Sequence, residues 1–418
     1  MSAFDVAIGL NEDGMNSLSQ QVYQRIYPNV FKGTTSAGGN TVSYDIKTPP
    51  KFNLLTTSEA QDALKQYLAQ HTGNLTPDEQ QFVNDMSQQV PTFILDFGEI
   101  DATLDSGGGN TTSIPFTATA YCHALVNNST LTLTPFHIDA KATSGGGAAN
   151  LLLNIMIHQL MSVSQQLVQS ITIPPITISG VALEPPIVGI EGNQIVVVTN
   201  VQGKGSPAFP SGQSWPNDPF FSLLSQDLLQ AAAAANPQAP MTGGDSSVKG
   251  AGPFKFGAEY GYNFTMVNPR VAINGTGLDI AFDLSGSISA GVYIFGHIGL
   301  CYGGSATPTP TAHCSLSVQG NSLEIVANNI SAFTIFVTPC GDVPSQVLSW
   351  MTEFIVAGIV ASLTPAVSAF LHDIHISSLQ IPAYTLPIDG QNLTMNPVNL
   401  SVIGVPGYIG LVGGLQLS

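Results

Sequence analysis

The sequence is poor in charge, and the charge that it has is mostly negative. Charged residues make up 9% of the 418 residues, with 10 lysines and arginines against 27 aspartates and glutamates, for a formal net charge of −17. Because soluble domains carry about 25% charged residues, solubility must come from Asn, Gln, Ser, Thr and Gly together with the acidic excess. A chain this acidic is repelled by phosphate backbones, so nucleic acid is a poor partner. It also has no polybasic cluster to hold it on an anionic membrane, so any membrane contact is expected to be transient.

Cysteine is scarce as well. Four cysteines in this length do not make a disulfide scaffold. Cys301 and Cys314 flank a Gly/Thr/Pro-rich loop and could bridge a hairpin in an oxidising compartment, whereas Cys122 and Cys340 have no evident partner. Reduced, packed thiols are expected, and the sequence does not decide the Cys301–Cys314 pair.

Targeting signals and membrane spans are also missing. The first residues carry no basic region followed by a long apolar stretch, so no signal peptide is expected. This predicts a cytoplasmic protein, or one released by a non-classical route. The uncharged segment 354–371 is nearly long enough to span a membrane, but Pro365 interrupts it and no basic or aromatic residues flank it. We expect a helix that the protein buries.

The motifs of catalysis and cofactor binding are not found. There is no Gly-x-Ser-x-Gly elbow of a hydrolase, and the segment 203–206 lacks the upstream spacing of a phosphate-binding loop. Asp96, Glu99 and Asp101 cluster on a predicted strand and could bind calcium, although a solvated acidic edge is the simpler interpretation. The sequence therefore predicts a protein that is not an enzyme and holds no metal or other cofactor.

Hydrophobic periodicity predicts the elements of the first half of the chain. Strands alternate with Gly/Ser/Asn loops, two polar helices form an inserted hairpin over 58–89, and a long apolar helix follows the strands. A helix is expected to end before Pro28, and Thr76-Pro77 is typical of a helix start. The predicted helices are 11–27, 58–71, 77–89 and 148–170, and the strand-like segments are 35–46, 92–103, 112–125, 130–142 and the extended text to 201.

The second half repeats this order after a Gly/Ser/Pro-rich linker at 202–213. A helix over 218–235, β segments over 254–338, a long helix over 343–371 and extended segments from 374 are expected. Two weak sequence echoes support duplication: 18–22 resembles 224–228, at a separation of 206, and 171–174 resembles 379–382, at a separation of 208. The alternative is that apolar segments of the sequence resemble one another by chance. The predicted modules are 1–201 and 214–418.

This order of elements, given twice in tandem, is similar to the TULIP superfamily, which includes BPI-like proteins, cholesteryl-ester-transfer-type proteins and relatives encoded in clostridial neurotoxin clusters. The opening IGLNEDGMNSLSQQVYQRIYP resembles the BPI-type beginning, and SSLQIPAYTLPIDGQNLTMNPVNLSVIGVPGYIGLVGGL resembles the BPI-type end. The resemblance covers nearly the whole chain by pattern, without a diagnostic motif. It implies an α+β fold of two tandem elongated antiparallel β-barrel/helix modules in a boomerang arrangement.

The resemblance also implies where a ligand would lie. Each module would hold an apolar pocket between its helices and its curved sheet, filled by a lipid. Ordinary core packing is the alternative for every residue in these pockets, and the acidic charge argues against the lipid A that cationic BPI binds. The implied lining is Leu18, Val22, Ile26, Ile155, Met156, Leu160 and Val163 in the first module, and Leu224, Leu228, Leu348, Met351, Ile355 and Ile359 in the second.

Two functions follow from these expectations. The first is binding or transfer of lipids or other hydrophobic small molecules in apolar tunnels. The alternative is a structural or interaction protein, such as a toxin-cluster accessory component, in which the barrels are scaffold and the hairpin 58–89 binds a protein partner. The sequence determines neither the lipid nor the oligomeric state.

Overall fold

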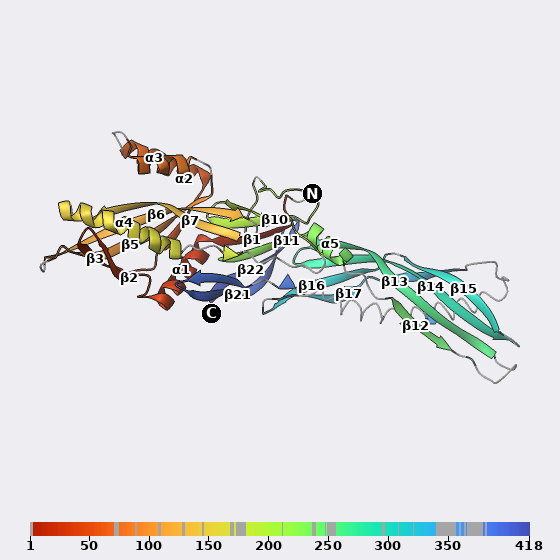
Figure 1. The fold of residues 1–418 in the computed structure, drawn as a ribbon. Coiled ribbons are helices and arrows are strands. Elements are labelled where there is room, and N and C mark those ends of the chain that lie inside the picture. Colours follow the sequence, from red (N-terminus) through yellow and green to blue (C-terminus); the bar gives the residue numbers. More distant parts are fainter. Residues whose placement is uncertain are drawn as a thin grey trace.

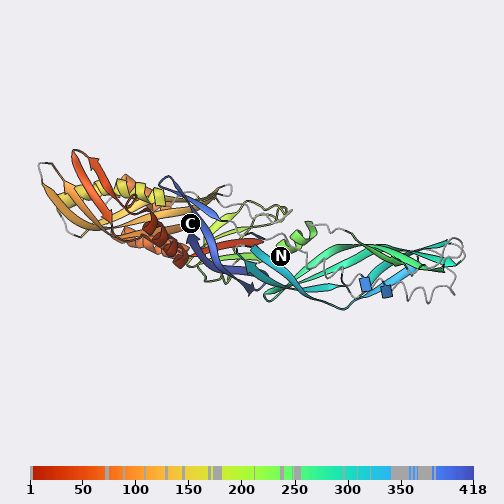
Figure 2. The same ribbon diagram turned by 90° about the horizontal axis from the view of Figure 1, so that it is seen from below.

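The computed structural model shows an elongated, gently bent molecule with three sheets in a row (Figures 1 and 2). The two chain ends lie near its middle (Figure 1). Most of the predicted helix 343–371, with the lining residues placed on it, Leu348, Met351, Ile355 and Ile359, lies outside the described residues, and the described positions 357–358, 361–362 and 365 are helical. The structure describes residues 3–70, 75–87, 90–107, 110–127, 130–143, 146–167, 171–172, 181–210, 212–235, 240–246, 248, 256–294, 297–307, 309–320, 322–339, 357–358, 361–362, 365, 379–380 and 383–418.

The central sheet contains both ends of the chain and its middle. Its seven antiparallel strands follow the order β20–β21–β22–β11–β1–β10–β9. β1 and β11 lie side by side at its centre, with Val6 opposite Leu224, and every residue of β11 is buried. The strands are β1 (Val6–Asn11), β9 (Ile187–Ile190), β10 (Gln194–Thr199), β11 (Phe220–Ser225), β20 (Tyr384–Ile388), β21 (Gln391–Val405) and β22 (Tyr408–Leu417).

The pairing registers of this sheet repeat at one offset. In the first half Val6 lies opposite Thr199, and in the second half Phe220 lies opposite Gly413. Each residue of the second pair comes 214 positions after its counterpart in the first pair. The same shift carries the pair Ile187–Val198 onto Ser401–Val412. A constant offset through four strand pairings is typical of a duplicated unit. The short sequence similarities at separations of 206 and 208 therefore do not align structurally equivalent residues. The module boundaries at 201 and 214 stay a prediction.

The predicted helix 218–235 is wrong in its first part. Residues Phe220–Ser225 form strand β11, and only Gln226–Ala235 form a helix, α5. Leu224, predicted on a helix, therefore lies on a central strand. A short apolar run buried on both faces of a sheet cannot be told from a buried helix by its periodicity.

The first end sheet has seven strands, in the order β2–β3–β5–β6–β7–β8, with β4 paired to β5. The segment 35–46, predicted as one strand, belongs to a hairpin, because Gly38 and Gly39 take positive φ angles of 61° and 82° in a two-residue turn. The strands are β2 (Lys32–Ala37), β3 (Asn40–Ile46), β4 (Lys51–Leu55), β5 (Thr92–Asp105), β6 (Thr111–Asn127), β7 (Thr130–Ala142) and β8 (Ile171–Thr172).

Helices cover both faces of this sheet. α1 (Glu12–Ile26) and α4 (Gly147–Leu167) pack with one set of strand side chains, including Phe93, Leu95 and Phe97, in the main hydrophobic core. The inserted hairpin, α2 (Thr57–Gln70) and α3 (Pro77–Met86), lies above β6 and β7 in Figure 1. It packs on the alternate strand residues, such as Ile94 and Tyr121, because neighbouring strand residues point to opposite faces. The predicted start at Thr76 is confirmed by a capping box with Glu79.

The second end sheet is built from eight strands. α5 packs against β13, and Leu229 of this helix joins a separate core cluster with Tyr260, Phe264 and Phe282. The strands are β12 (Met241–Ser246), β13 (Phe256–Asn274), β14 (Gly277–Ile294), β15 (His297–Thr307), β16 (Thr311–Gln319), β17 (Ser322–Ile330), β18 (Thr334–Pro339) and β19 (Leu379–Gln380). The predicted α+β class, with two elongated antiparallel modules in tandem, is confirmed.

The register of the second sheet decides the question of the Cys301–Cys314 bridge. Cys301 lies opposite Ser289 and Cys314 opposite Leu278, eleven positions apart along β14. At about 3.4 Å per residue this separates the two residues by about 37 Å, far beyond the range of a disulfide. Cys314 is a free, buried thiol.

No helix in the part of the chain that the structure describes is long and apolar enough to cross a membrane.

Candidate functional site

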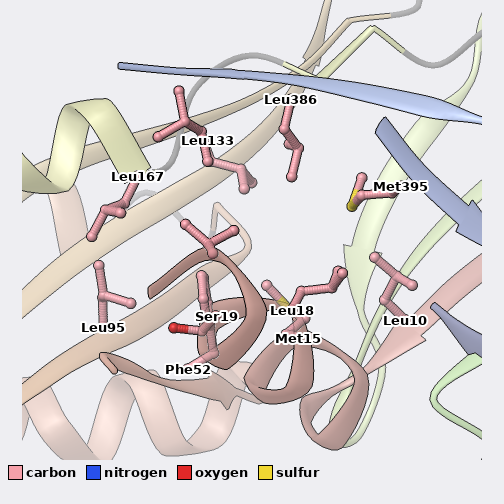
Figure 3. Close-up of a pocket in the computed structure, with 12 residues that line it drawn as sticks. Leu10, Met15, Leu18, Ser19, Phe52, Leu95, Leu133, Leu167, Leu386 and Met395 are labelled. Atoms are coloured by element: carbon pink, nitrogen blue, oxygen red, sulfur yellow. The ribbon is translucent and has the colours of Figure 1, made fainter. Parts of the chain in front are cut away.

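An apolar cavity lies between α1, the inner face of the first end sheet and the β20–β21 hairpin (Figure 3). Its volume is about 70 Å³. Figure 3 shows Leu386 and Met395 on one side of the space, with Met15 and Leu18 of α1 on the other. The cavity is lined by Leu10, Met15, Leu18, Ser19, Val22, Phe52, Leu95, Leu133, Leu167, Leu386, Ile388 and Met395.

Helix α1 presents Met15, Leu18 and Val22 to this space because these residues recur at spacings of three and four. Its start is fixed by Asn11, whose Oδ1 accepts from the Gly14 N–H at 2.8 Å while its Nδ2 donates to the Asn217 carbonyl at 3.1 Å. Gly14 permits this docking, since a Cβ there would lie 2.2 Å from the Pro219 carbonyl oxygen. The first turn of α1 is therefore locked against the segment that leads into β11.

Two further side chains hold the flanks of α1. The Gln21 amide bridges the helix to β22, accepting from the Leu417 N–H at 2.9 Å and donating to the Leu415 carbonyl at 3.2 Å. The Asn16 amide does the same on β4, accepting from the Phe52 N–H at 2.7 Å and donating to the Phe52 carbonyl at 3.1 Å. Both amides satisfy backbone groups on strands, so α1 forms a rigid wall of the cavity.

The chemistry of the lining is that of hydrocarbon. Among the described lining residues Ser19 alone carries a hydroxyl, and this group donates to the Pro50 carbonyl. None of the described residues of the lining is charged. Over the described ranges, no group of three or more His, Cys, Asp or Glu side chains is placed to hold a metal. The described lining can bury an apolar guest.

The predicted lining residues are only partly brought together. Leu18 and Val22 line the cavity. The other described ones are buried in the same core cluster, but they are not among the lining: Ile26, Ile155, Met156, Leu160, Val163, Leu224 and Leu228. The role of the predicted residues as ligand contacts stays a prediction.

Sequence reasoning missed the β20–β21 wall. Leu386, Ile388 and Met395 belong to the predicted second module, yet they line a cavity of the first end of the molecule. The apolar alternation of Leu386 with Ile388, and of Leu393 with Met395, was a signal for a half-buried hairpin. Which surface this hairpin covers depends on the central sheet, where β21 pairs with β22.

Labelling of two buried thiols, Cys122 and Cys314, can test whether the inner faces of the two end sheets are closed to solvent. Burial raises the pKa of the Cys122 thiol on β6, and burial together with the charge of Asp279 raises the pKa of Cys314 to about 11. A raised thiol pKa favours the neutral, unreactive form. At pH 8 we expect iodoacetamide to leave Cys122 and Cys314 unlabelled in the native protein and to label both in urea, as read by peptide mass spectrometry. Fast native labelling of Cys122 would show that the inner face of the first end sheet opens to solvent.

Comparisons with known proteins are as follows. No protein-family model matches the chain, and no curated protein sequence matches it. Among solved structures, it is similar to P47 from Clostridium botulinum A2, with 7% identity and a TM-score of 0.42 over 99% of this chain and 97% of that one. It is also similar to a lipopolysaccharide binding protein (11% identity, TM-score 0.37) and to P47 of Clostridium botulinum E1 (8%, 0.37), each over 99% of both chains. At such identities these likenesses concern the fold alone, and function is derived from the chain's own geometry.

Proposed function

We propose that the protein binds the hydrocarbon chain of a lipid, or another hydrophobic molecule, in the cavity between α1 and the β20–β21 hairpin. The observation that supports this is the described lining, in which only Ser19 has a polar side chain, and its hydroxyl already has a partner. Apolar cavities stay dry and accept apolar guests. Nothing in the described lining selects a headgroup, so discrimination among headgroups should be low.

The size of the cavity implies that one wall moves. About 70 Å³ is less than the roughly 150 Å³ of an engineered apolar cavity that binds benzene. β20 is the wall expected to yield, because it is a five-residue edge strand that pairs only with β21 among the described strands. It carries Leu386 and Ile388, and the flexible side chains of Met15 and Met395 can adapt to a guest.

The energy available is adequate for such a displacement. Each methylene removed from water contributes about 0.8 kcal/mol, so an acyl chain of about 16 methylenes contributes roughly 13 kcal/mol before costs. Association and the shift of β20 offset part of this gain. The surplus grows with chain length, so longer chains should bind more tightly until the opened space is filled.

Binding can be tested with cis-parinaric acid, a fluorescent fatty acid, titrated into delipidated protein. We expect saturable binding by the wild type and at least tenfold weaker binding by Leu18→Phe, because the larger ring occupies the cavity. The matched control is Leu151→Phe, the same substitution at a position on α4 whose side chain is 39% exposed, and it should bind like the wild type. Absence of saturable binding, or equal affinities for wild type and Leu18→Phe, would contradict the proposal.

A further inference from the structure

A second cavity, of about 460 Å³, lies between the helical hairpin and strand β9. Its volume falls within the roughly 300–1,000 Å³ of small-molecule sites. On the hairpin side it is lined by Leu64 and Met86, and on the side of the central sheet by residues Val188, Gly189, Ile190 and Glu191 together with Phe209. None of its described lining residues also lines the cavity beside α1.

The cavity runs along the free edge of β9. Four consecutive residues line it, and since neighbouring strand residues point to opposite faces, a space that touches all four lies at the edge. The Glu191 N–H donates to the Gln194 carbonyl at 2.9 Å, so Glu191 and Gln194 form a hydrogen-bonded pair of the β9–β10 hairpin. In an antiparallel ladder such pairs alternate, and the N–H and C=O groups of Val188 and Ile190 therefore point outward, toward the cavity.

The charge on the described lining of this cavity is negative. Glu191 is the one charged residue of the described lining, which includes no lysine, arginine or histidine. No hydrogen bond or ion pair among the described residues uses its carboxylate. The Glu191 carboxylate and the outward carbonyl of the neighbouring Ile190 can both accept hydrogen bonds from a cation that carries N–H donors.

From this arrangement we propose that the cavity beneath the hairpin binds a small amphipathic amine. Its ammonium group lies at the Glu191 carboxylate and the Ile190 carbonyl, and its apolar part packs against Leu64, Met86 and Phe209. This site is separate from the lipid cavity in place and in ligand chemistry. An anion of the same length finds no basic partner in the described lining and meets the repulsion of Glu191.

The probe is n-octylamine, with n-octanoate as its charge-reversed counterpart, titrated calorimetrically at pH 7. We expect octylamine to bind saturably and at least tenfold more tightly than octanoate. Glu191→Gln should weaken octylamine binding at least tenfold, because it removes a charge-assisted hydrogen bond. Glu99→Gln, the same change at an exposed position of β5, is the matched control and should have no effect.

A second pair of variants tests the location without touching Glu191. Gln61→Lys places a positive charge at the exposed rim of the cavity and should also weaken octylamine binding, whereas Gln66→Lys, exposed on the same helix and outside the lining, should not. Leu18→Phe should leave the preference for octylamine over octanoate unchanged, because it alters only the other cavity, whose described lining selects no headgroup. Octanoate binding as tightly as octylamine, an unaffected Glu191→Gln variant, or no saturable binding of octylamine would each overturn the proposal.

Discussion

Replacement of Asp5 by alanine is expected to lower the free energy of unfolding by about 3–5 kcal/mol, the cost of breaking a buried ion pair. Asp5 is 1% exposed and accepts from the Val201 N–H at 2.8 Å, the Ser225 hydroxyl at 2.6 Å and the Lys204 ammonium at 3.1 Å. Ser225 ends β11, whereas Val201 and Lys204 lie in the segment between β10 and β11. Alanine leaves all three without this acceptor at the centre of the molecule.

Urea denaturation followed by circular dichroism measures this loss. The matched control is Asp227→Asn, which removes the other partner of Lys204, at 2.8 Å and with a side chain 42% exposed. An exposed ion pair of this kind contributes about 1 kcal/mol or less. If Asp5→Ala cost no more than Asp227→Asn, the junction would not depend on the buried carboxylate.

The same junction predicts a dependence on alkaline pH. Burial alone would lower the pKa of Lys204, but its hydrogen bonds to Asp227 and Asp5 more than offset this, so the pKa is raised above its ordinary value of 10.5. The stability contributed by the ion pairs is therefore complete below pH 10.5 and is lost as the pH rises through the raised pKa. The difference in unfolding free energy between wild type and Asp5→Ala should shrink in that range.

Replacement of Phe82 by alanine is expected to undock the helical hairpin, at a local cost of about 3–5 kcal/mol. Phe82 is 2% exposed, and its ring centroid lies 4.5 Å from that of Tyr67, 5.0 Å from Tyr121 and 4.2 Å from His137. This cluster is small and separate from the main core. Because the hairpin is inserted between β4 and β5, which pair with each other directly, the sheet should survive its release.

Limited proteolysis with mass spectrometry should locate new cleavage between Thr56 and Pro91 in Phe82→Ala, at protease concentrations that leave the rest intact. Leu68→Ala, at a position that is 40% exposed on α2, is the control and should change stability by less than about 0.5 kcal/mol. Undocking should abolish the preference for octylamine over octanoate and preserve binding of cis-parinaric acid. Cleavage throughout the chain would instead show that the hairpin belongs to one cooperative unit with the sheets.

Local patterns predicted α1, α3 and α4 well, but they extended the helix of α5 over strand β11 and treated the β2–β3 hairpin as one strand. α1 and α3 agree with their predicted starts because Asn11 and Thr76 supply side-chain caps that act within a single turn. α4 has the expected apolar spacing, with Leu152, Met156 and Leu160 buried. β11 was mistaken for helix because its run of buried residues has no period of two to recognise.

The sequence by itself determined the amphipathic helices, the alternating strands, the tandem order and the acidic, sparsely charged character of the chain, because each depends on composition or on residues a few positions apart. The tertiary structure decided that β20 and β21 close a cavity beside α1, that β11 lies next to β1, and that the hairpin forms a cavity with β9. These contacts join segments from distant parts of the chain. Their partners are selected by strand register and by the burial of both faces of the central sheet, which no local period encodes.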